Sequence, residues 1–414
     1  MMELTRRAAF GFLAGWTGAS GKALAQQAPN HNINIGAIYP LSGRDAVVGQ
    51  NANLAFRVML EIVHGDYDLD LPMARTDHLP RLPGARLRHL IADHRGDPGT
   101  ARLEAEKLIA TGKVVALIGA GDERIADAVA GVAERAGIPF LDTDSASPRP
   151  GGRGSGLVFR FAPGDENRVA TLVEFLGHAG QSGGPKIRSI AMLHDKEPED
   201  VRLANMLRAA ATAAGMTIAV ELPYIRGNPA LAAEALAQTR AAPDCVVMIG
   251  PASDAAGLPN PVSHPGARPA VVCLPSRIAD RVQGPVPAAR GAFMVKSFAR
   301  DTKANNPNIA AINTLYRSYA KKDLDGPTAI QFTASLTLAF AINESRNASG
   351  AAIAEKIAST RFPGDRTIMP WSELRFDPAG MNVGAAVIVA QRIEDRLNTV
   401  FPDQHATAVP VWKA

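Results

Sequence analysis

The sequence predicts an α/β protein built on two doubly wound parallel sheets, and three observations support this. Short apolar runs rich in β-branched residues, such as 114–118 and 245–249, alternate with segments whose apolar residues recur at helical spacing. The alternation occurs in two successive series, separated by a glycine- and arginine-rich segment at 148–156. The chain has 414 residues, too many for one ordinary core, so two domains are expected. Alternating strands and helices form parallel sheets with helices on both faces.

The first series begins with an apolar run that ends at Tyr39. The polar, proline-broken segment 65–84 predicts a surface insertion. Asp97 is a good helix cap, and Pro98 suits the first helical position because its missing N–H costs nothing there. The expected elements are strands at 33–39 and 88–93 and helices at about 47–63 and 97–111.

The segment 114–148 contains one complete β-α-β unit. The apolar run 114–118 predicts a strand, and Ile125, Val129 and Val132 then recur at helical spacing. Gly137 is a typical C-terminal helix cap, and a second strand follows at 138–141 before the polar loop 142–148. The loops after these two strands lie at the carboxyl edge of a parallel sheet, which is where ligands bind in open α/β sheets.

The second series begins after the glycine-rich segment with an extended run at 157–161. Three helices and a strand-rich tail end the chain. Helices are expected at 166–178, 199–214, 229–240, after Ser253, and at 308–321, 327–345 and 351–360. Strand-like runs lie at 187–193, 217–222, 245–249, 270–274, 291–297, 372–376, 385–391 and 398–401.

The composition is that of a globular chain, with 46% hydrophobic and 5% aromatic residues. A formal net charge of +4 does not indicate nucleic-acid binding. Cys245 and Cys273 both lie in strand-like runs without metal-type spacing. They are expected to be small buried apolar residues; a disulfide between them after export is the alternative.

Residues 1–25 have the layout of an export signal. Arg6 and Arg7 precede a short apolar core, and Ala23 and Ala25 form an A-x-A cleavage site. The arginine pair suggests the twin-arginine route, although Phe10 lies one place later than the usual pattern, so the general route stays open. We expect an exported periplasmic protein without a lipid anchor.

Several phrases, taken in order along the chain, resemble those of one family. They are 35–43 (IGAIYPLSG), 91–98 (IADHRGDP), 105–109 (AEKLI), 118–119 (IG), 137–139 (GIP), 145–148 (SASP), 159–163 (FRFAP) and 376–380 (FDPAG). The ordered set is similar to the leucine/isoleucine/valine-binding family, the type I periplasmic solute-binding proteins of ABC importers. The resemblance extends from about residue 33 to residue 410.

This resemblance implies two lobes joined by a three-crossing hinge, with crossings near Phe159, Met294 and Gly380. Lobe 1 is expected at 31–159 and 294–380, and lobe 2 at 160–293 and 381–414. Ligand binding would close the hinge over a small ligand, and a permease in the inner membrane would bind the closed form. The expected partners are a small-molecule ligand and this ABC permease, with no cofactor and no nucleic acid, and the protein is expected to be a monomer.

In the family, the loop before the third helix and the loop after the fourth strand hold an amino-acid ligand. The first loop here offers Gly121, Asp122 and Glu123, with Glu123 in place of the usual serine. The second offers Asp144, Ser145 and Ala146, with Ala146 in place of the usual threonine. These changes favour an amine, amide or hydroxyl-rich ligand over a carboxylate. The alternative for Asp122 and Glu123 is a structural one, because acids favour the first turn of any helix.

Lobe 2 of many relatives supplies aromatic residues and an acid. The matching loops carry Glu199, Pro251 and Arg277 instead. Glu199 is equally suited to a solvated helix start. Arg277 suits an anionic ligand group or a surface pair with Asp280.

Enzyme hypotheses find little support. Gly119 and Gly121 are half of a dinucleotide fingerprint, but Arg124 stands where the third glycine belongs. His94 and His194 each lie beside an aspartate at a strand end, without a nucleophile elbow, and are expected to be solvated loop residues. We therefore expect a solute-binding protein for a small amino-acid-like or amide-like molecule. The alternative is a ligand sensor of the same fold that signals to a membrane receptor.

Overall fold

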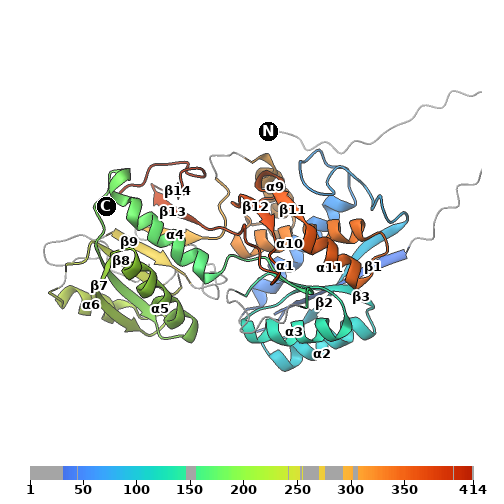
Figure 1. Ribbon diagram of the computed structural model, residues 1–414, viewed down its shortest axis with the longest axis horizontal. Coiled ribbons are helices and arrows are strands. Elements are labelled where there is room, and N and C mark those ends of the chain that lie inside the picture. The colour runs from blue at the N-terminus through green and yellow to red at the C-terminus, as the bar shows by residue number, and fades with distance from the viewer. Residues whose placement is uncertain are drawn as a thin grey trace, which may run out of the picture.

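The structure is a computed structural model that describes residues 31–43, 45–145, 155–240, 242–251, 254, 270–275, 292–301, 306–394 and 396–412. Two sheets, each with helices on both faces, lie side by side along the long axis of the molecule (Figure 1). This confirms the predicted α/β class with two doubly wound sheets. The expected export signal, Ala146 and Arg277 lie outside the described residues. None of the described helices combines the length and apolarity needed to cross a membrane.

The first sheet has five strands in the order β2-β1-β3-β4-β5, and every neighbouring pair is parallel. The inner strand β3 is apolar along its length because helices cover both faces, whereas the edge strand β2 begins by alternating buried residues with exposed arginines. Their bounds are β1 His31–Tyr39, β2 Ala85–Asp93, β3 Val114–Gly119, β4 Phe140–Asp142 and β5 Val158–Arg160.

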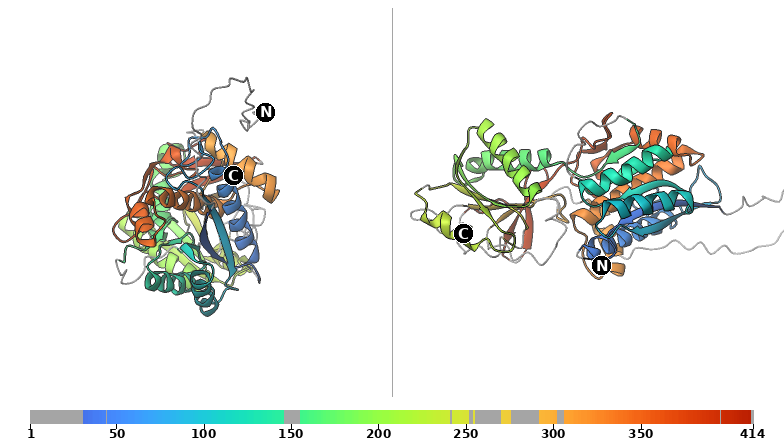
Figure 2. Two further views of the ribbon diagram at one scale, coloured as in Figure 1. Left: turned by 90° about the vertical axis from the view of Figure 1, so that its right-hand side faces the viewer. Right: turned by 90° about the horizontal axis from the view of Figure 1, so that it is seen from below.

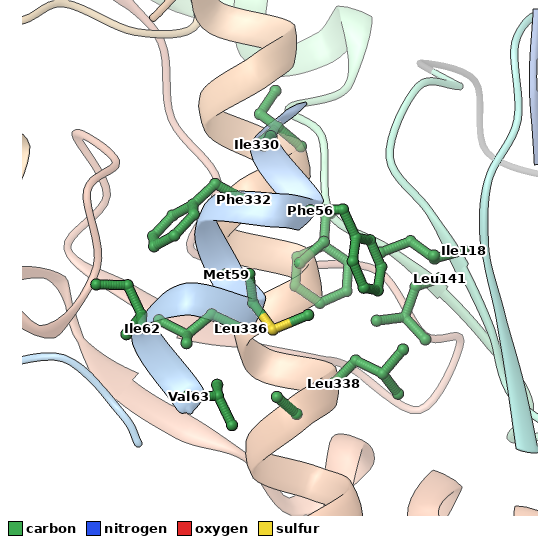
Figure 3. Close-up of a cluster of buried hydrophobic side chains, with 14 of the residues drawn as sticks. Phe56, Met59, Ile62, Val63, Ile118, Leu141, Ile330, Phe332, Leu336 and Leu338 are labelled. Atoms are coloured by element: carbon green, nitrogen blue, oxygen red, sulfur yellow. The ribbon is translucent and has the colours of Figure 1, made fainter. Parts of the chain in front are cut away.

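Two helix layers cover this sheet. One face carries α2 (Pro98–Ala110) and α3 (Glu123–Ala136). The other carries α1 (Ala46–Val63), α9 (Pro307–Ala320), α10 (Gly326–Ser345) and α11 (Gly350–Ser359). Figure 3 shows α1 and α10 packed through Met59, Phe332 and Leu336, with Ile118 and Leu141 of the sheet beside Phe56.

The second sheet has seven strands in the order β14-β13-β10-β9-β8-β6-β7. Its five parallel strands are β6 Ser189–Asp195, β7 Thr217–Tyr224, β8 Cys245–Ile249, β9 Ala270–Leu274 and β10 Phe293–Lys296. The late strand β13 (Ile388–Ile393) pairs antiparallel with β10 at the edge, and β14 (Arg396–Phe401) pairs antiparallel with β13. The sheet is therefore mixed at one edge, which the alternating pattern of the sequence does not predict.

Helices α4 (Asp165–His178) and α5 (Pro198–Ala213) cover one face of the second sheet, and α6 (Ala230–Gln238) covers the other (Figure 2). Trp412 covers the core between the second sheet and α4 and α5 by stacking on Phe175 and contacting Phe293. The C-terminal end of the chain is thus part of the second core.

The chain passes between the two sheets three times. The first passage follows β5, and the third lies between β12 (Glu373–Arg375), which pairs with β11 (Arg361–Pro363), and β13. The second passage, expected near Met294, follows Lys296 at the end of β10; Met294 itself pairs with Cys273 and Ala390 inside that strand. At the third passage Gly380 has φ +79°, and a Cβ there would lie 2.0 Å from the carbonyl oxygen of Val158, so only glycine fits.

The segment 65–84 is not the expected surface insertion. Leu69, Leu71, Leu79 and Leu82 are buried in the core of the first sheet. Arg81 donates its backbone N–H to Asn343 Oδ1 at the end of α10. The leucines have no regular spacing, so periodicity does not reveal their burial.

Cys245 and Cys273 are both free and buried. In the parallel pairing of β8 with β9, Cys245 lies opposite Ala270, and Cys273 lies opposite Met248. Positions three apart on a strand point to opposite faces, so the two sulfurs lie in different cores. The apolar interpretation is confirmed, and burial raises the pKa of the Cys273 thiol to about 12.

Candidate functional site

A pocket of about 400 Å³ lies at the carboxyl edge of the first sheet. The loops after β1, β2 and β3 form its walls. Its size suits a small metabolite. It is lined by Pro40, Ser42, Gly43, Asp45, Val48, His94, Arg95, Gly96, Ala120, Gly121, Asp122, Arg124 and Ile125.

Asp122 caps the N-terminus of α3 from inside this pocket. Its Oδ1 accepts the backbone N–H of Ile125 at 3.0 Å, and its Oδ2 accepts Arg124 Nη2 at 2.9 Å. Partial burial alone would raise the pKa of this carboxyl, but the hydrogen bonds from Arg124 and Ile125 more than offset it and lower the pKa. The protein's own carboxylate thus occupies donors that a ligand carboxylate would need.

His94 forms the pocket wall behind Gly121. It is buried, with 1% of its surface exposed, which corrects the expectation of a solvated loop histidine. Its Nδ1 accepts the backbone N–H of Gly96 at 2.9 Å, so the neutral ring carries its proton on Nε2. A Cβ at Gly121 would lie 3.4 Å from His94 Nε2, so the missing side chain leaves room beside the ring.

The loop after β4 is held rigidly at the same edge. The carboxylate of Asp142 accepts the backbone N–H groups of Asp144 and Ser145, each at 3.0 Å, and the hydroxyl of Ser145. The guanidinium of Arg160 lies 3.6 Å from Asp142 and is almost fully buried. Ser145 therefore fixes the loop that presents Asp144, and Asp144 lines a second, smaller cavity beside Val48.

Glu123 connects the two halves of the molecule. Its Oε1 lies 3.1 Å from Arg202 Nη1 on α5, and Arg202 Nη2 lies 2.8 Å from Asp165 at the start of α4. Glu123 belongs to the first sheet's helices, whereas Arg202 and Asp165 belong to the second's. The pKa of Arg124 is raised, chiefly by the hydrogen bond and charge of Asp122, and the charge of Glu199 on α5 contributes as well. The first turns of α3 and α5 therefore face each other.

The edge of the second sheet contains a buried charge cluster that the sequence interpretation missed. Arg226, after β7, donates Nε to Asp195 at the end of β6 and Nη2 to Asp200 at 3.0 Å. Both carboxylates are nearly inaccessible, and such acids need a cation to offset their desolvation. Asp195 ends β6, soon after the apolar run 190–193, which is the one sequence feature that marks it.

Two further residues considered from the sequence, Pro251 and His194, lie near this edge. Pro251 is buried, and its carbonyl accepts the backbone N–H of Asp254 at 2.9 Å. His194 is also buried rather than solvated, with Nε2 3.2 Å from Glu221. Among the described residues no group of three or more His, Cys, Asp or Glu side chains has the arrangement of a metal site.

Two sheet-and-helix units joined by three crossings, with a pocket at the carboxyl edge of the first sheet, are typical of type I periplasmic binding proteins. A family model described as Periplasmic binding protein matches residues 32–392, and the chain belongs to this family. This confirms the resemblance stated above. The members of the family are solute-binding proteins rather than enzymes.

More particular similarities agree with this assignment. The Leu/Ile/Val-binding protein homolog 8 of Brucella abortus (strain 2308) is 22% identical over 395 residues, covering 91% of this chain and 92% of that protein. An ABC transporter substrate-binding protein from Desulfitobacterium hafniense, in complex with Leu, superposes with a TM-score of 0.68 at 19% identity, covering 89% and 100% of the two chains. A solute binding protein of an R. palustris ABC transporter, in complex with benzoate, gives 0.66 at 16% identity, covering 89% and 96%.

Proposed function

We propose that the chain is the extracytoplasmic solute-binding protein of an ABC importer and captures a small polar ligand, amino-acid-like or amide-like, between two lobes. Lobe 1 is the first sheet with its helices, and lobe 2 is the second sheet with its helices. The observation that carries the proposal is the pocket at the carboxyl edge of lobe 1, whose rim residue Glu123 reaches Arg202 of lobe 2. Relatives that bind leucine and benzoate support a small organic ligand.

The chemistry of the pocket favours a ligand rich in hydrogen-bond donors. Asp122 already occupies a backbone donor of the α3 N-terminus and brings a negative charge to it. Asp45 adds another acid to the lining; of the two lining arginines, Arg124 is engaged by Asp122, and Arg95 is the other. A ligand carboxylate would find the α3 donor already occupied by Asp122, whereas an amine, amide N–H or hydroxyl would find acceptors in the two acids. Gly121, Asp122 and Asp144 are the contacts we propose on lobe 1, with Glu123 at the rim.

Hinge closure would bury such a ligand and complete the site with lobe 2. A ligand shifts the lobes toward the closed form only by its difference in affinity for the two forms. The Glu123–Arg202 pair contributes to that balance because it joins the lobes directly. The partner that binds the closed form would be an ABC permease in the inner membrane, and the protein would act in the periplasm as a monomer.

A thermal-shift screen of primary amides, amines, amino acids and carboxylates tests this function. A true ligand at 100 times its Kd should add about 2.7 kcal/mol to the free energy of unfolding. Amides and amines should lead the ranking, and simple carboxylates should give the smallest shifts. No shift from any compound would contradict the proposed function.

A matched pair of glycine variants locates the site. A methyl group at Gly121 would enter the pocket 3.2 Å from Ile125 Cδ1, whereas one at Gly131 on α3 meets nothing closer than 3.6 Å. Gly121→Ala should weaken the hit about tenfold or more, and Gly131→Ala should leave it unchanged. Equal behaviour of the two variants would place the ligand elsewhere.

A further inference from the structure

Helix α10 is buried on nearly all sides, and most of its polar side chains form hydrogen bonds within the helix itself. The hydroxyls of Thr333, Ser335 and Thr337 each donate to a carbonyl of the preceding turn, at 2.8–2.9 Å. Gln331, with 2% of its surface exposed, behaves differently because its amide points to β1. It takes part in a buried polar chain between segments that are far apart in the sequence.

That chain consists of Thr143, Tyr39 and Gln331. The hydroxyl of Tyr39 donates to Gln331 Oε1 and lies 3.3 Å from Thr143 Oγ1. Burial, with a further contribution from the charge of Asp144, raises the pKa of the Tyr39 phenol well above its ordinary value. Tyr39 therefore stays protonated and remains a donor, which leaves the oxygen of the Gln331 amide engaged.

The nitrogen of the same amide has no hydrogen-bond partner in the described part of the chain. A buried amide N–H without an acceptor is costly, and native proteins rarely leave one in that state. Gln331 also lines a small cavity, so an acceptor placed in that cavity would lie beside the amide.

The cavity has a volume of about 10 Å³, which is room for one oxygen-sized group. Val48 lines both this cavity and the larger pocket, so the two are adjacent. It is lined by Tyr39, Val48, Asn51, Ala52, Thr143, Asp144, Asp325, Pro327, Thr328 and Gln331.

We propose that this cavity is a hydroxyl subsite of the ligand pocket, in which the Gln331 amide and the Asp144 carboxylate hold one hydroxyl-type oxygen. The oxygen is a ligand hydroxyl in the bound form and a water molecule in the unbound form. This inference rests on the proposed function, because it assigns the substrate class as hydroxylated amides or amino acids.

Three alternative groups fit the cavity less well. A carboxylate is larger than one oxygen and would face Asp144 and Asp325. An ammonium group offers no acceptor to the amide N–H of Gln331. A methyl group would leave that N–H unsatisfied. If the Gln331 amide were rotated, its oxygen would face the cavity instead, and a hydroxyl would still fit because it both donates and accepts.

Matched ligand pairs that differ by hydroxyl groups test the subsite. We would measure Kd by calorimetry for lactamide against propionamide, threonine against valine, and 3,4-dihydroxybenzoate against benzoate. The wild type should prefer the hydroxylated member of any pair that binds by about tenfold or more. Gln331→Met should reduce this preference to less than about threefold, and Thr337→Val, which removes a self-satisfied hydroxyl from the same helix, should retain it.

Several outcomes would overturn the subsite. A wild-type protein that does not discriminate within any bound pair would do so, as would a Gln331→Met protein that discriminates as strongly as the wild type. If Gln331→Met does not fold, Gln331→Glu keeps the acceptor for Tyr39 but removes the N–H, and it should show the same loss of preference.

A ligand-free crystal structure separates failure of the subsite from failure of the proposed function. If no compound in the panel binds, the solute-binding proposal fails, while the cavity can still be judged directly. The subsite predicts one ordered solvent oxygen within about 3.2 Å of the Gln331 amide. A well-resolved cavity without that oxygen would refute the subsite even if ligands bind elsewhere in the pocket.

Discussion

Asp122 gives the sharpest test because its two roles, capping α3 and charging the pocket, can be separated by substitution. Asp122→Ala removes both the cap and the charge. Asp122→Asn removes only the charge, because asparagine caps a helix about as well as aspartate does. The hydrogen bond from Ile125 to Asp122 Oδ1, at 3.0 Å, is the cap at stake.

We expect Asp122→Ala to lower the free energy of unfolding by about 1 kcal/mol and Asp122→Asn to lower it by less than about 0.5 kcal/mol. The measurement is urea unfolding at pH 7. Asp97→Ala is the control, since Asp97 accepts the backbone N–H of Thr100 at 2.7 Å as the cap of α2 but does not line the pocket. It should cost a similar amount.

Ligand ranking then separates the two roles. Both Asp122 variants should weaken amine and amide ligands and strengthen carboxylates relative to the wild type, whereas Asp97→Ala should leave the ranking unchanged. An unchanged ranking in Asp122→Asn would refute the assignment of Asp122 to the site. A ranking altered equally by Asp97→Ala would show that the effect is one of stability.

Two further predictions concern the lobe contact and a buried histidine. A double-mutant cycle of Glu123→Gln and Arg202→Gln, measured by urea unfolding at low salt, should give a coupling energy of about 0.5–1 kcal/mol. The coupling should fade at about 1 M NaCl, because each side chain is about a third exposed and salt therefore screens the pair. A coupling energy that does not change with salt would contradict a charge contact. Burial lowers the pKa of His89 below that of the unfolded chain, so its contribution to stability is present above about pH 6.5 and is lost as the pH falls. His89→Gln should therefore flatten the fall in urea midpoint between about pH 7 and pH 5, and an unchanged slope would show that other groups set this dependence.

The central parallel strands could be predicted from sequence because burial on both faces makes them uninterrupted apolar runs, as in 114–118 and 245–249. The cap Asp97 could be predicted because capping is a local property, whereas Asp122 was expected only as a ligand contact or as an acid of the first helical turn. Features that depend on pairing across long separations could not. Asp195 and Arg226 lie 31 positions apart, and Tyr39 and Gln331 lie 292 apart. The orientation of β13 and the burial of His94 likewise depend on neighbours that come from other parts of the chain, so the local sequence does not predict them.

The late return of the chain to the second sheet has a consequence during synthesis. Strand β10 keeps an open edge until β13 has been made, and α9, α10 and α11 all emerge from the ribosome in between. Those same helices are needed to bury the apolar face of the first sheet. Trp412, next to Phe175 and Phe293, is translated later still. Neither lobe can therefore complete its fold before the late strands and helices have been translated. A prematurely terminated product would expose both an unpaired strand edge and an uncovered sheet face, which are features that favour aggregation and proteolysis.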